Sequence, residues 1–589
     1  MIPQQMSKDS AAKIFDWRLL VKIFSLALPY QRKFYTAVFL TLSMAILGPL
    51  RPALIQHALD TYVPANDSLG LLNFCLLIFA LLFIQSIMQW WSTILANFLG
   101  QQIIYDLRNK VYKHLFSLRL NFFDKTPVGT LVTRSISDIE TISEVFSEGM
   151  INIAGDILQI IFLLLLMFGT NVKLSLVCLS VLPFLFYSGY LFKEKIKESF
   201  EDVRNQVAIL NTYVQEHLSG MQIVQLFNRE DRELESFKEI NARHRDANIK
   251  SVFYYSVFFP VVEVLTAISI GLLVWYGSKG IIAEEITLGT MVSFIMYINL
   301  FFRPIRTLAD RFNNLQMGMI AAERIFVLIE DETPKETEGQ LVLNQTEGNI
   351  EFKNIYFSYN ADQPVLKNIN FTVKKGQTIA LVGATGAGKS SIINLLSRFY
   401  PTEKGQILID GTEIEQYTLA SLRSKISVVM QDVFLFTGSI LENIQLYNNT
   451  ISEETIIACA KQLGAHDFIS KMPNGYHQKV TERGSSLSVG QRQLISFVRA
   501  MVINPAILIL DEATSSIDHD TEEIIQHAIL KMREGRSSIV IAHRLSTIAN
   551  ADEILVVDKG EIVERGTHQS LLENSGYYKN LYEHQFAMQ

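Results

Sequence analysis

Cysteine is scarce in this sequence, which has three among 589 residues. Cys75 and Cys178 lie in apolar runs, and Cys459 lies in the more polar second half of the chain. Neither their number nor their spacing forms the pattern of a disulfide framework or a metal-binding site. We therefore expect them to be small core or lipid-facing residues.

Positive charge is also in short supply. The 52 lysines and arginines are outnumbered by 59 aspartates and glutamates, so the formal net charge is −7. A chain that binds nucleic acid needs a basic surface to neutralise phosphates. The charge balance therefore predicts a protein without a nucleic-acid partner.

The start of the chain lacks the continuous apolar run of a signal peptide, so we expect no cleaved signal. Residues 16–28 instead show an amphipathic pattern with Trp17, Arg18 and Lys22 at its edges. Such a pattern is typical of a helix that lies in the membrane interface. A soluble N-terminal helix is the alternative.

Long apolar runs, in contrast, are abundant. Hydrophobic residues make up 49% of the chain, and the mean hydropathy is +0.21. A helix that crosses a bilayer needs about 20 apolar residues. Six segments meet this requirement, at 34–54, 69–95, 151–169, 174–192, 252–277 and 288–302.

The change in polarity along the chain predicts a multi-domain fold. We expect an all-α six-helix transmembrane domain at 1–329, followed by an α/β P-loop NTPase domain at 349–589. Between them, 330–348 is charged and contains proline, as a linker does. The polar connections at 100–150 and 193–250 read as helical extensions of the spans, with turns near 123–129 and 210–220; solvated loops are the alternative.

Basic residues predict the orientation of the spans. They are frequent before the first span, between spans two and three, and between spans four and five, whereas residues 60–68 contain no Lys or Arg. Loops rich in Lys and Arg stay in the cytoplasm. Both termini are therefore expected in the cytoplasm, where ATP is.

Three ionisable residues fall within the predicted spans: Arg51, Asp156 and Glu263. Buried charge in a membrane is costly and frequently marks a transport pathway. Each of the three could line a water-filled route and touch cargo. Interhelical ion pairs or interfacial positions are the alternative.

A phosphate-binding loop occupies residues 383–390, which satisfy the G-x-x-x-x-G-K-[ST] pattern. It follows a strand-like run, 378–382, and precedes a helix-like run, 391–396, as the motif requires. Backbone N–H groups of such a loop face phosphates, Lys389 adds a charge, and Ser390 can bind Mg²⁺. The predicted nucleotide-binding set in this region is Gly383, Ala384, Thr385, Gly386, Ala387, Gly388, Lys389, Ser390 and Ser391.

Two carboxylates follow another apolar run, 507–510. Asp511 is suited to hold Mg²⁺ through water, and Glu512 to act as general base toward an attacking water. Carboxylates at this place could instead cap the next helix. The phosphate loop upstream favours the catalytic interpretation.

The order of these motifs resembles the ATP-binding-cassette (ABC) family. It comprises the phosphate loop, Gln431, 487–491 (Leu-Ser-Val-Gly-Gln), the pair Asp511–Glu512, 515–518 and His543. Six spans ahead of one such domain resemble the exporter branch, and the similarity covers nearly the whole chain. The segments 134–138, 321–324 and 481–484 are also similar to stretches of exporters.

The resemblance implies a role for each matching residue. Tyr359 would stack on adenine, because an aromatic face accepts any base. Gln431 would sense Mg²⁺ and the γ-phosphate, and His543 would hydrogen-bond the γ-phosphate. The implied catalytic set is Lys389, Gln431, Glu512 and His543, and the implied Mg²⁺ ligands are Ser390, Gln431 and Asp511.

The resemblance also implies that the cassette acts as a dimer. Ser488, Gly490 and Gln491 would close over a nucleotide bound to the phosphate loop of a second cassette. One chain carries one cassette, so the working unit needs either a second copy or a sibling chain. Val489 and 516–517 depart from the commonest family pattern, and we still expect activity because Ser488 and Gly490 are intact.

The sequence therefore predicts a multi-pass ATPase of the bacterial inner membrane that binds ATP and Mg²⁺ and exports a lipid or a drug. The absence of a peptidase-like extension before the spans disfavours a peptide-processing exporter. A soluble ABC ATPase is disfavoured by the six spans. An ATP-gated channel or regulator stays open.

Overall fold

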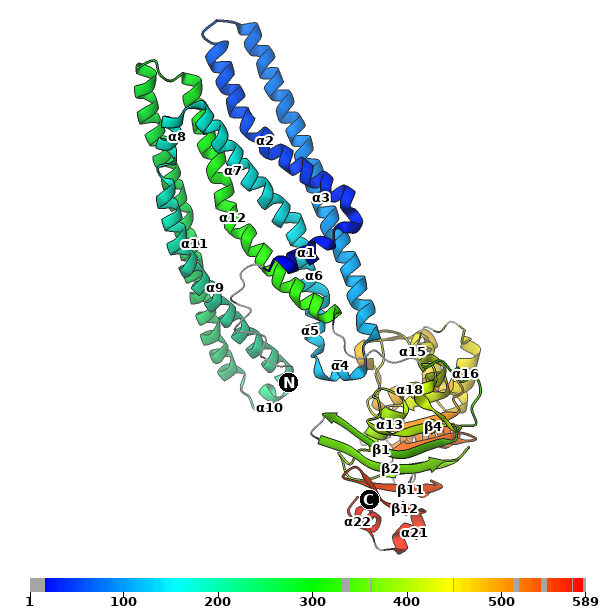
Figure 1. Ribbon diagram of the computed structural model, residues 1–589. Helices are drawn as coiled ribbons and strands as arrows, with labels where there is room; N and C mark the ends of the chain where they lie inside the picture. The colour runs from blue at the N-terminus through cyan, green and yellow to red at the C-terminus, as the bar shows by residue number, and fades with distance from the viewer. Residues whose placement is uncertain are drawn as a thin grey trace. The chain divides into compact units, whose positions relative to one another are not determined.

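The computed structural model describes residues 16–330, 339–360, 363–446, 448, 450–511, 519–541, 548–574 and 576–585 (Figure 1). Contacts within the chain divide it into two compact units. The first, here called the membrane unit, lies within 1–116 and 127–331. The second, the cassette unit, lies within 332–589 and includes 117–126.

The membrane unit is built from helices. Its α-helices are α1 (Trp17–Ser25), α2 (Gln31–Thr61), α3 (Ser68–Ser117), α5 (Val128–Thr133), α6 (Ile139–Glu144), α7 (Met150–Thr170), α8 (Val172–Leu179), α9 (Leu182–Ser219), α10 (Met221–Leu226), α11 (Glu230–Ile282) and α12 (Leu288–Ile329). Six helical stretches of the described chain are long and apolar enough to cross a membrane. They coincide with the six predicted spans, so that prediction is confirmed.

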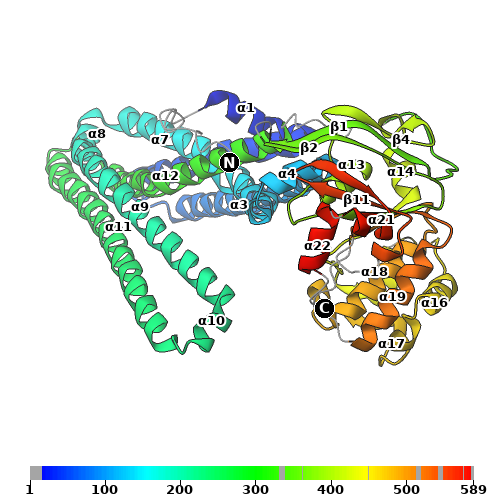
Figure 2. The same cartoon turned by 90° about the horizontal axis from the view of Figure 1, so that it is seen from below.

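Several of these helices continue well past the bilayer, as the polar connections predicted. Helix α11 has 53 residues, and at about 1.5 Å per residue it far exceeds the roughly 30 Å hydrocarbon core. Helices α9 and α11 lie side by side as a long hairpin closed by α10 (Figure 2). The turn expected near 210–220 falls at the end of that range, because α9 continues to Ser219 and Gly220 is its C-cap.

The entry to the third span follows an unusual helical path. Two π-helical turns, at Arg134–Asp138 and Val145–Gly149, flank α6. Close packing accompanies the second turn, since a Cβ built on Gly318 of α12 would lie 2.0 Å from a methyl of Val145. Small residues let helix backbones approach closely in this way, which stabilises helix pairs in a membrane, where the hydrophobic effect does not drive their association.

The cassette unit contains two main sheets. One is antiparallel with the order β2 (Gln363–Val373), β1 (Ile350–Asn360), β4 (Lys404–Ile409) and β5 (Thr412–Glu413). The other has the order β12 (Glu561–Gly566), β11 (Glu553–Asp558), β3 (Thr378–Val382), β10 (Ser537–Ile541), β9 (Ile507–Asp511) and β6 (Ile426–Val429). A short ribbon pairs β7 (Gly438–Ser439) with β8 (Lys479–Val480).

Buried strands identify the second sheet as the core of the cassette. Every residue of β3 and β10 is buried, and β11, β3, β10, β9 and β6 run parallel. Parallel sheets need cover on both faces. The α-helices of the unit are α4 (Leu120–Lys125), α13 (Lys389–Leu396), α14 (Leu419–Lys425), α15 (Ile440–Gln445), α16 (Glu453–Gln462), α17 (His466–Ser470), α18 (Val489–Met501), α19 (His519–Arg533), α21 (His568–Glu573) and α22 (Tyr577–Gln585).

The segment expected as a linker is packed in part. Among its described residues, Leu343 is buried in the core of the cassette unit. Leu341 also forms a β-bridge to Tyr417. The second half of the segment therefore lies against the cassette unit.

Candidate nucleotide-binding site

The phosphate loop joins β3 to α13, which is the strand–loop–helix context predicted for it. Gly386 and Gly388 have φ angles of 83° and 108°, which residues with a Cβ rarely adopt. A Cβ on Gly388 would also lie 2.7 Å from a methyl of Leu366. These two glycines are therefore needed to form the loop.

Exposure varies along the loop in a way that suits a phosphate ligand. Ala384, Thr385, Gly386 and Ser390 are exposed, whereas Gly383, Ala387, Gly388 and Lys389 are buried. Helix α13 begins directly after the loop, so its unpaired N–H groups and the positive end of its dipole lie beside it. The loop thus exposes the backbone of 384–386 and holds the positive charge of Lys389 beneath it.

Lys389 is 7% exposed, and its Nζ donates hydrogen bonds to the carbonyl oxygens of Gly383 at 2.8 Å and Ala384 at 2.9 Å. Burial lowers the pKa of its ammonium group, and the negative charge of Asp511 partly opposes that effect. The side chain is therefore folded back over its own loop. This arrangement places a cation where phosphate oxygens would replace the two carbonyls.

Asp511 reaches the same edge of the sheet by strand register. Ile541 of β10 pairs with Leu381 of β3 on one side and with Asp511 of β9 on the other. Neighbouring strands lie about 4.8 Å apart, so Asp511 ends its strand two strands away from the start of the loop. Gln431 follows β6, the next strand after β9, and is exposed.

The donor set at this edge fits Mg²⁺. It consists of the hydroxyl of Ser390, the amide oxygen of Gln431 and the carboxylate of Asp511, which are the hard oxygen ligands that Mg²⁺ prefers. The described residues contain no group of three or more His, Cys, Asp or Glu that could hold a metal by themselves. Phosphate oxygens and water would complete such a site.

The signature segment begins helix α18. Ser488 is the N-cap: its Oγ accepts a hydrogen bond from the N–H of Gln491 at 3.2 Å, and Gln491 Oε1 accepts one from the N–H of Ser488 at 3.1 Å. Gly490 is buried, whereas the departing residue Val489 is 45% exposed. This reciprocal cap holds Ser488 at an exposed helix N-terminus, which is suited to an anion.

Tyr359 lies beside the helix that follows the phosphate loop. Its hydroxyl lies 3.1 Å from Ser391 Oγ and accepts a hydrogen bond from Asn394 at 3.1 Å. Edge contacts with Phe357 and Tyr400 fix the ring. The position suits the predicted stacking on adenine, which stays a prediction.

Two residues that the sequence did not single out, buried Asn443 and half-buried Arg499, hold the segment after Gln431. Asn443 accepts a hydrogen bond from the N–H of Phe436 at 2.8 Å and donates one to its carbonyl at 2.9 Å. Arg499 of α18 donates to the carbonyls of Phe434 at 3.0 Å and Asn443 at 2.8 Å. Burial lowers the pKa of the Arg499 guanidinium. The signature helix is therefore connected to the segment of Gln431.

Helix α4 packs within the cassette unit, a placement that the sequence did not predict. The hydroxyl of Tyr400 donates a hydrogen bond to Asp124 of α4. Burial raises the pKa of the Asp124 carboxyl. Helix α4 ends at Lys125, and Thr126 and Pro127 separate it from α5, inside the predicted turn 123–129.

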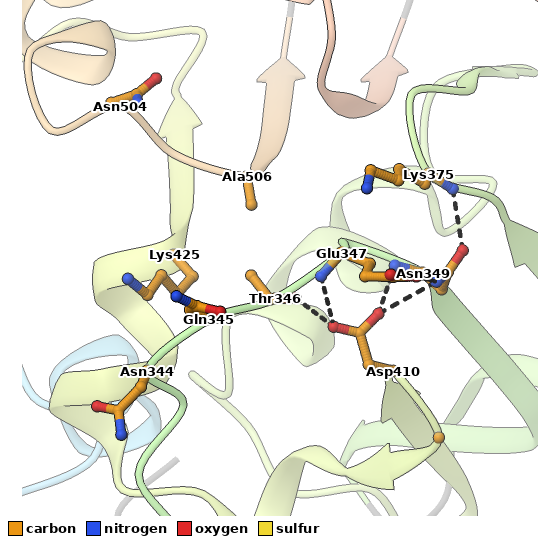
Figure 3. A pocket seen from close by; sticks show the side chains of 11 residues that line it. Asn344, Gln345, Thr346, Glu347, Asn349, Lys375, Asp410, Lys425, Asn504 and Ala506 are labelled. Carbon is orange, nitrogen blue, oxygen red and sulfur yellow. Dashed lines mark hydrogen bonds between the residues drawn. The ribbon is translucent and has the colours of Figure 1, made fainter.

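A polar cavity of about 870 Å³ lies elsewhere on the cassette unit (Figure 3). At its centre, Asp410 accepts hydrogen bonds from the Thr346 hydroxyl at 2.6 Å and from the N–H of Asn349 at 2.9 Å. Ala506, which precedes β9, also lines the cavity. The cavity is therefore at the amino end of β9, and the phosphate loop and Asp511 are at the opposite, carboxyl end of the sheet.

Several predicted site residues lie outside the described residues. These are Glu512, the segment 515–518 and His543. Their predicted roles remain predictions.

The ionisable residues of the spans differ in their surroundings. Asp156 forms an ion pair with Arg311, which joins α7 to α12. The Nε of Arg51 is buried and has no hydrogen-bond partner among the described residues. Glu263 is exposed on α11. The interhelical pair accounts for Asp156, and contact with cargo stays a prediction for all three.

Comparison with known families gives two matches along the chain. The ABC transporter transmembrane region matches residues 34–305, and the ABC transporter family matches residues 366–515. Together they include all six predicted spans in full and the motifs from the phosphate loop to Asp511.

Curated relatives match over most of their own length. A protein of Bacillus subtilis, called uncharacterized ABC transporter ATP-binding protein YknV, is 37% identical over 99% of this chain and 97% of its own. Another from the same species, the probable multidrug resistance ABC transporter ATP-binding/permease protein YheH, is 37% identical over 86% and 75%. The ATP-dependent lipid A-core flippase of Syntrophus aciditrophicus is 36% identical over 96% and 94%.

A solved structure is similar throughout. A bacterial Atm1-family ABC exporter with ATP bound superposes with a TM-score of 0.77 at 28% identity, over 94% of this chain and 98% of that one. The fold of a six-span helical region followed by an ATP-binding cassette is therefore that of an exporter.

Proposed function

Because this chain belongs to the ABC transporter family and to its exporters, we propose that it hydrolyses ATP to move amphipathic cargo out of the cytoplasm or the inner leaflet. One observation carries the proposal: a single polypeptide joins six membrane-spanning helices to a cassette that holds a phosphate loop and a signature helix. A pump needs both parts, and a soluble ATPase needs only the second.

ATP would bind between two cassettes. Lys389 and the N-terminus of α13 would hold the β- and γ-phosphates of one nucleotide. The signature residues Ser488, Gly490 and Gln491 of a second cassette would close over it, and the exposure of Ser488 at the N-terminus of α18 supports this arrangement. A homodimer with two equal sites is the simplest assembly, and pairing with a sibling chain is the alternative.

Hydrolysis would require an activated water and a neutralised γ-phosphate. Glu512, one residue beyond β9, is placed in sequence to polarise the water, and His543 to hydrogen-bond the γ-phosphate. Ser390, Gln431 and Asp511 would hold Mg²⁺, which supplies charge neutralisation when bound. Gln431 would also report the state of the nucleotide, since its segment is fastened to α18 by Arg499.

The cargo would be a lipid or a drug-like amphipathic molecule. The names of two relatives, a lipid A-core flippase and a probable multidrug resistance protein, support this class. Closure of the cassettes would tilt the long helices and expose the pathway to the other side by alternating access. Both termini would lie in the cytoplasm of a bacterial cell, on the inner membrane.

Transport in proteoliposomes tests the proposal. Wild-type protein should move a fluorescent lipid or a cationic dye in an ATP-dependent manner, and Glu512→Gln should abolish both transport and ATPase activity while ATP binding persists. An ATP-gated channel would show the opposite result, a passive flux that survives Glu512→Gln. Native mass spectrometry of the chain expressed alone distinguishes the two assemblies, since an inactive monomer contradicts the homodimer.

A further inference from the structure

An apolar pocket of about 480 Å³ lies at the start of the membrane unit, beside α1, α2 and α7. Phe24 and Leu28 form one wall, Tyr35 and Leu42 of α2 a second, and Ala154 of α7 a third. Gln31, at the first position of α2, is the polar member of the lining. The pocket therefore combines apolar walls with a polar group at one end.

The pocket sits where the chain meets the membrane interface. Helix α1 buries Leu20 and Ile23 against the unit, whereas Trp17 and Val21 on its other side are 67% and 53% exposed. An amphipathic helix with an exposed tryptophan is typical of the boundary between head groups and acyl chains. Phe24 of this helix also lines the apolar pocket, so the pocket lies beside a helix of the interfacial type.

A basic residue, Arg32, directly follows the lining residue Gln31 in the chain. Arg32 is exposed in the first turn of α2, three residues before Tyr35, and residues three apart share one side of a helix. Lys33 points to another side, since its Nζ lies 3.5 Å from the ring centre of Phe98 on α3. One guanidinium and the amide of Gln31 are thus available to a group that occupies the pocket.

We propose that this pocket binds one acyl chain of an anionic phospholipid, with the lipid phosphate held by Arg32 and Gln31. Bilayer chains are as apolar as the pocket walls, so apolar contact alone gives little preference for the pocket over the bulk membrane. The head group must supply the difference, and a guanidinium matches a phosphate in shape and charge. A zwitterionic lipid also has a phosphate, but its ammonium group opposes the charge of Arg32, so the site should prefer an anionic lipid. It depends on the membrane location of the unit and not on the transport cycle.

Native mass spectrometry of the full chain tests the site. The protein is released from nanodiscs of phosphatidylcholine with about 20% phosphatidylglycerol. Wild-type protein should retain phosphatidylglycerol in preference to phosphatidylcholine. Ala154→Trp, which fills the pocket from an exposed position of α7, should remove this retained lipid. Ile161→Trp, on an exposed position of α7 that does not line the pocket, is the matched control and should leave it unchanged.

The head-group contact has its own pair of variants. Arg32→Gln should lower retention about five-fold, the equivalent of one basic residue at a membrane surface, whereas Lys33→Gln should have little effect. Equal losses in the two variants, or full retention in Ala154→Trp, would overturn the proposal. Because lipid counting requires no ATP hydrolysis, its failure is separate from failure of the proposed transport.

A second copy of the chain is the other possible occupant. Ala154→Cys in a chain that also carries Cys75→Ser, which removes the exposed native thiol, tests this. Rapid disulfide cross-linking between two copies at position 154 would show that a protein neighbour covers the pocket and would contradict lipid binding. Ala154→Cys that forms no cross-link and reacts with a lipid-soluble maleimide supports lipid binding.

Discussion

At the scale of single residues, Lys389 shows how an ionisable group is held ready for a ligand. Its ammonium donates to two carbonyl oxygens of its own loop, and burial lowers its pKa. Phosphate oxygens carry full negative charge and would be far stronger acceptors than carbonyls. Nucleotide binding therefore needs only a small swing of a side chain that is already in place.

Replacing Lys389 with Ala should weaken ATP binding without unfolding the loop, whose shape is set by its glycines. Loss of a charged hydrogen-bonding group costs about 1.5–3 kcal/mol, so the Kd for ATP should rise roughly ten- to hundred-fold. The measurement is isothermal titration of the purified protein. Lys375→Ala, at the distant polar cavity, is the control and should bind as the wild type does. An unchanged Kd in Lys389→Ala would show that the phosphates lie elsewhere.

Asp410 is a residue whose ionised carboxylate supports the fold and not the chemistry. Desolvation raises its pKa, but hydrogen bonds from Thr346 and from the N–H groups of Asn349, Glu347 and Gly348 outweigh that effect and hold the pKa below the ordinary value of 3.8. A carboxyl whose pKa is lower in the folded than in the unfolded protein stabilises the fold at pH values above its unfolded-state pKa. This stabilisation is lost as the pH falls through the folded value.

Asp410→Asn should therefore lower the melting temperature at pH 7, where the carboxylate is fully charged. Because the residue is exposed, we expect a cost of about 1 kcal/mol. The difference from wild type should shrink as the pH falls below 3.8. Thermal unfolding in detergent over a pH series measures it, with exposed Glu561→Gln as the control. A difference that does not change with pH would mean that the charge of Asp410 is not what stabilises this turn.

At the scale of elements, the signature helix α18 and the segment after Gln431 behave as one part. Arg499 reaches from the helix to two backbone carbonyls, and buried Asn443 bonds both the N–H and the carbonyl of Phe436. One of these four hydrogen bonds joins α18 to the segment directly, and the other three join them through Asn443 of α15. Under the proposed function, a change at Gln431 would therefore reach the helix that carries Ser488.

Arg499→Lys keeps the charge but loses the planar fork that reaches both carbonyls. We expect a loss of about 1–3 kcal/mol in the free energy of unfolding, together with faster amide exchange in residues 431–437. Hydrogen exchange read by mass spectrometry locates the effect. Arg565→Lys, at an exposed position of β12, is the matched control. Protection of 431–437 equal to that of the wild type would show that this segment is held by other contacts.

Elements also show what local sequence can predict. Unbroken apolar runs predict strands β3 and β9 and the six spans. A segment that is apolar on every side shows such a run and no alternation with polar residues. The turn after α9 could be predicted only to the range 210–220, because no proline or other strong breaker precedes Gly220. The contact of Tyr400 with Asp124 was missed since 276 residues separate the two, and neither local pattern refers to the other. Asn443 and Arg499 belong to no sequence motif that would predict their hydrogen bonds to the segment after Gln431.

At the scale of the whole molecule, one cassette presents a phosphate loop and a signature helix that the proposed function assigns to different sites. This assignment can be tested by complementation between two defective chains. Lys389→Ala damages the loop, and Ser488→Arg places a bulky cation at the N-terminus of α18 in place of its cap. Each variant alone, as a homodimer, should trap no nucleotide with vanadate because both of its sites contain one damaged half.

The mixed dimer separates the two arrangements. If each site joins the loop of one chain to the signature of the other, one site combines both lesions and the second combines an intact Lys389 with an intact Ser488. Two different affinity tags isolate the mixed dimer, and radioactive ATP counts the trapped nucleotide. We expect one nucleotide per mixed dimer, against two in the wild type and none in either homodimer. If loop and signature served the same site within one chain, every site in the mixed dimer would be damaged and none would be trapped.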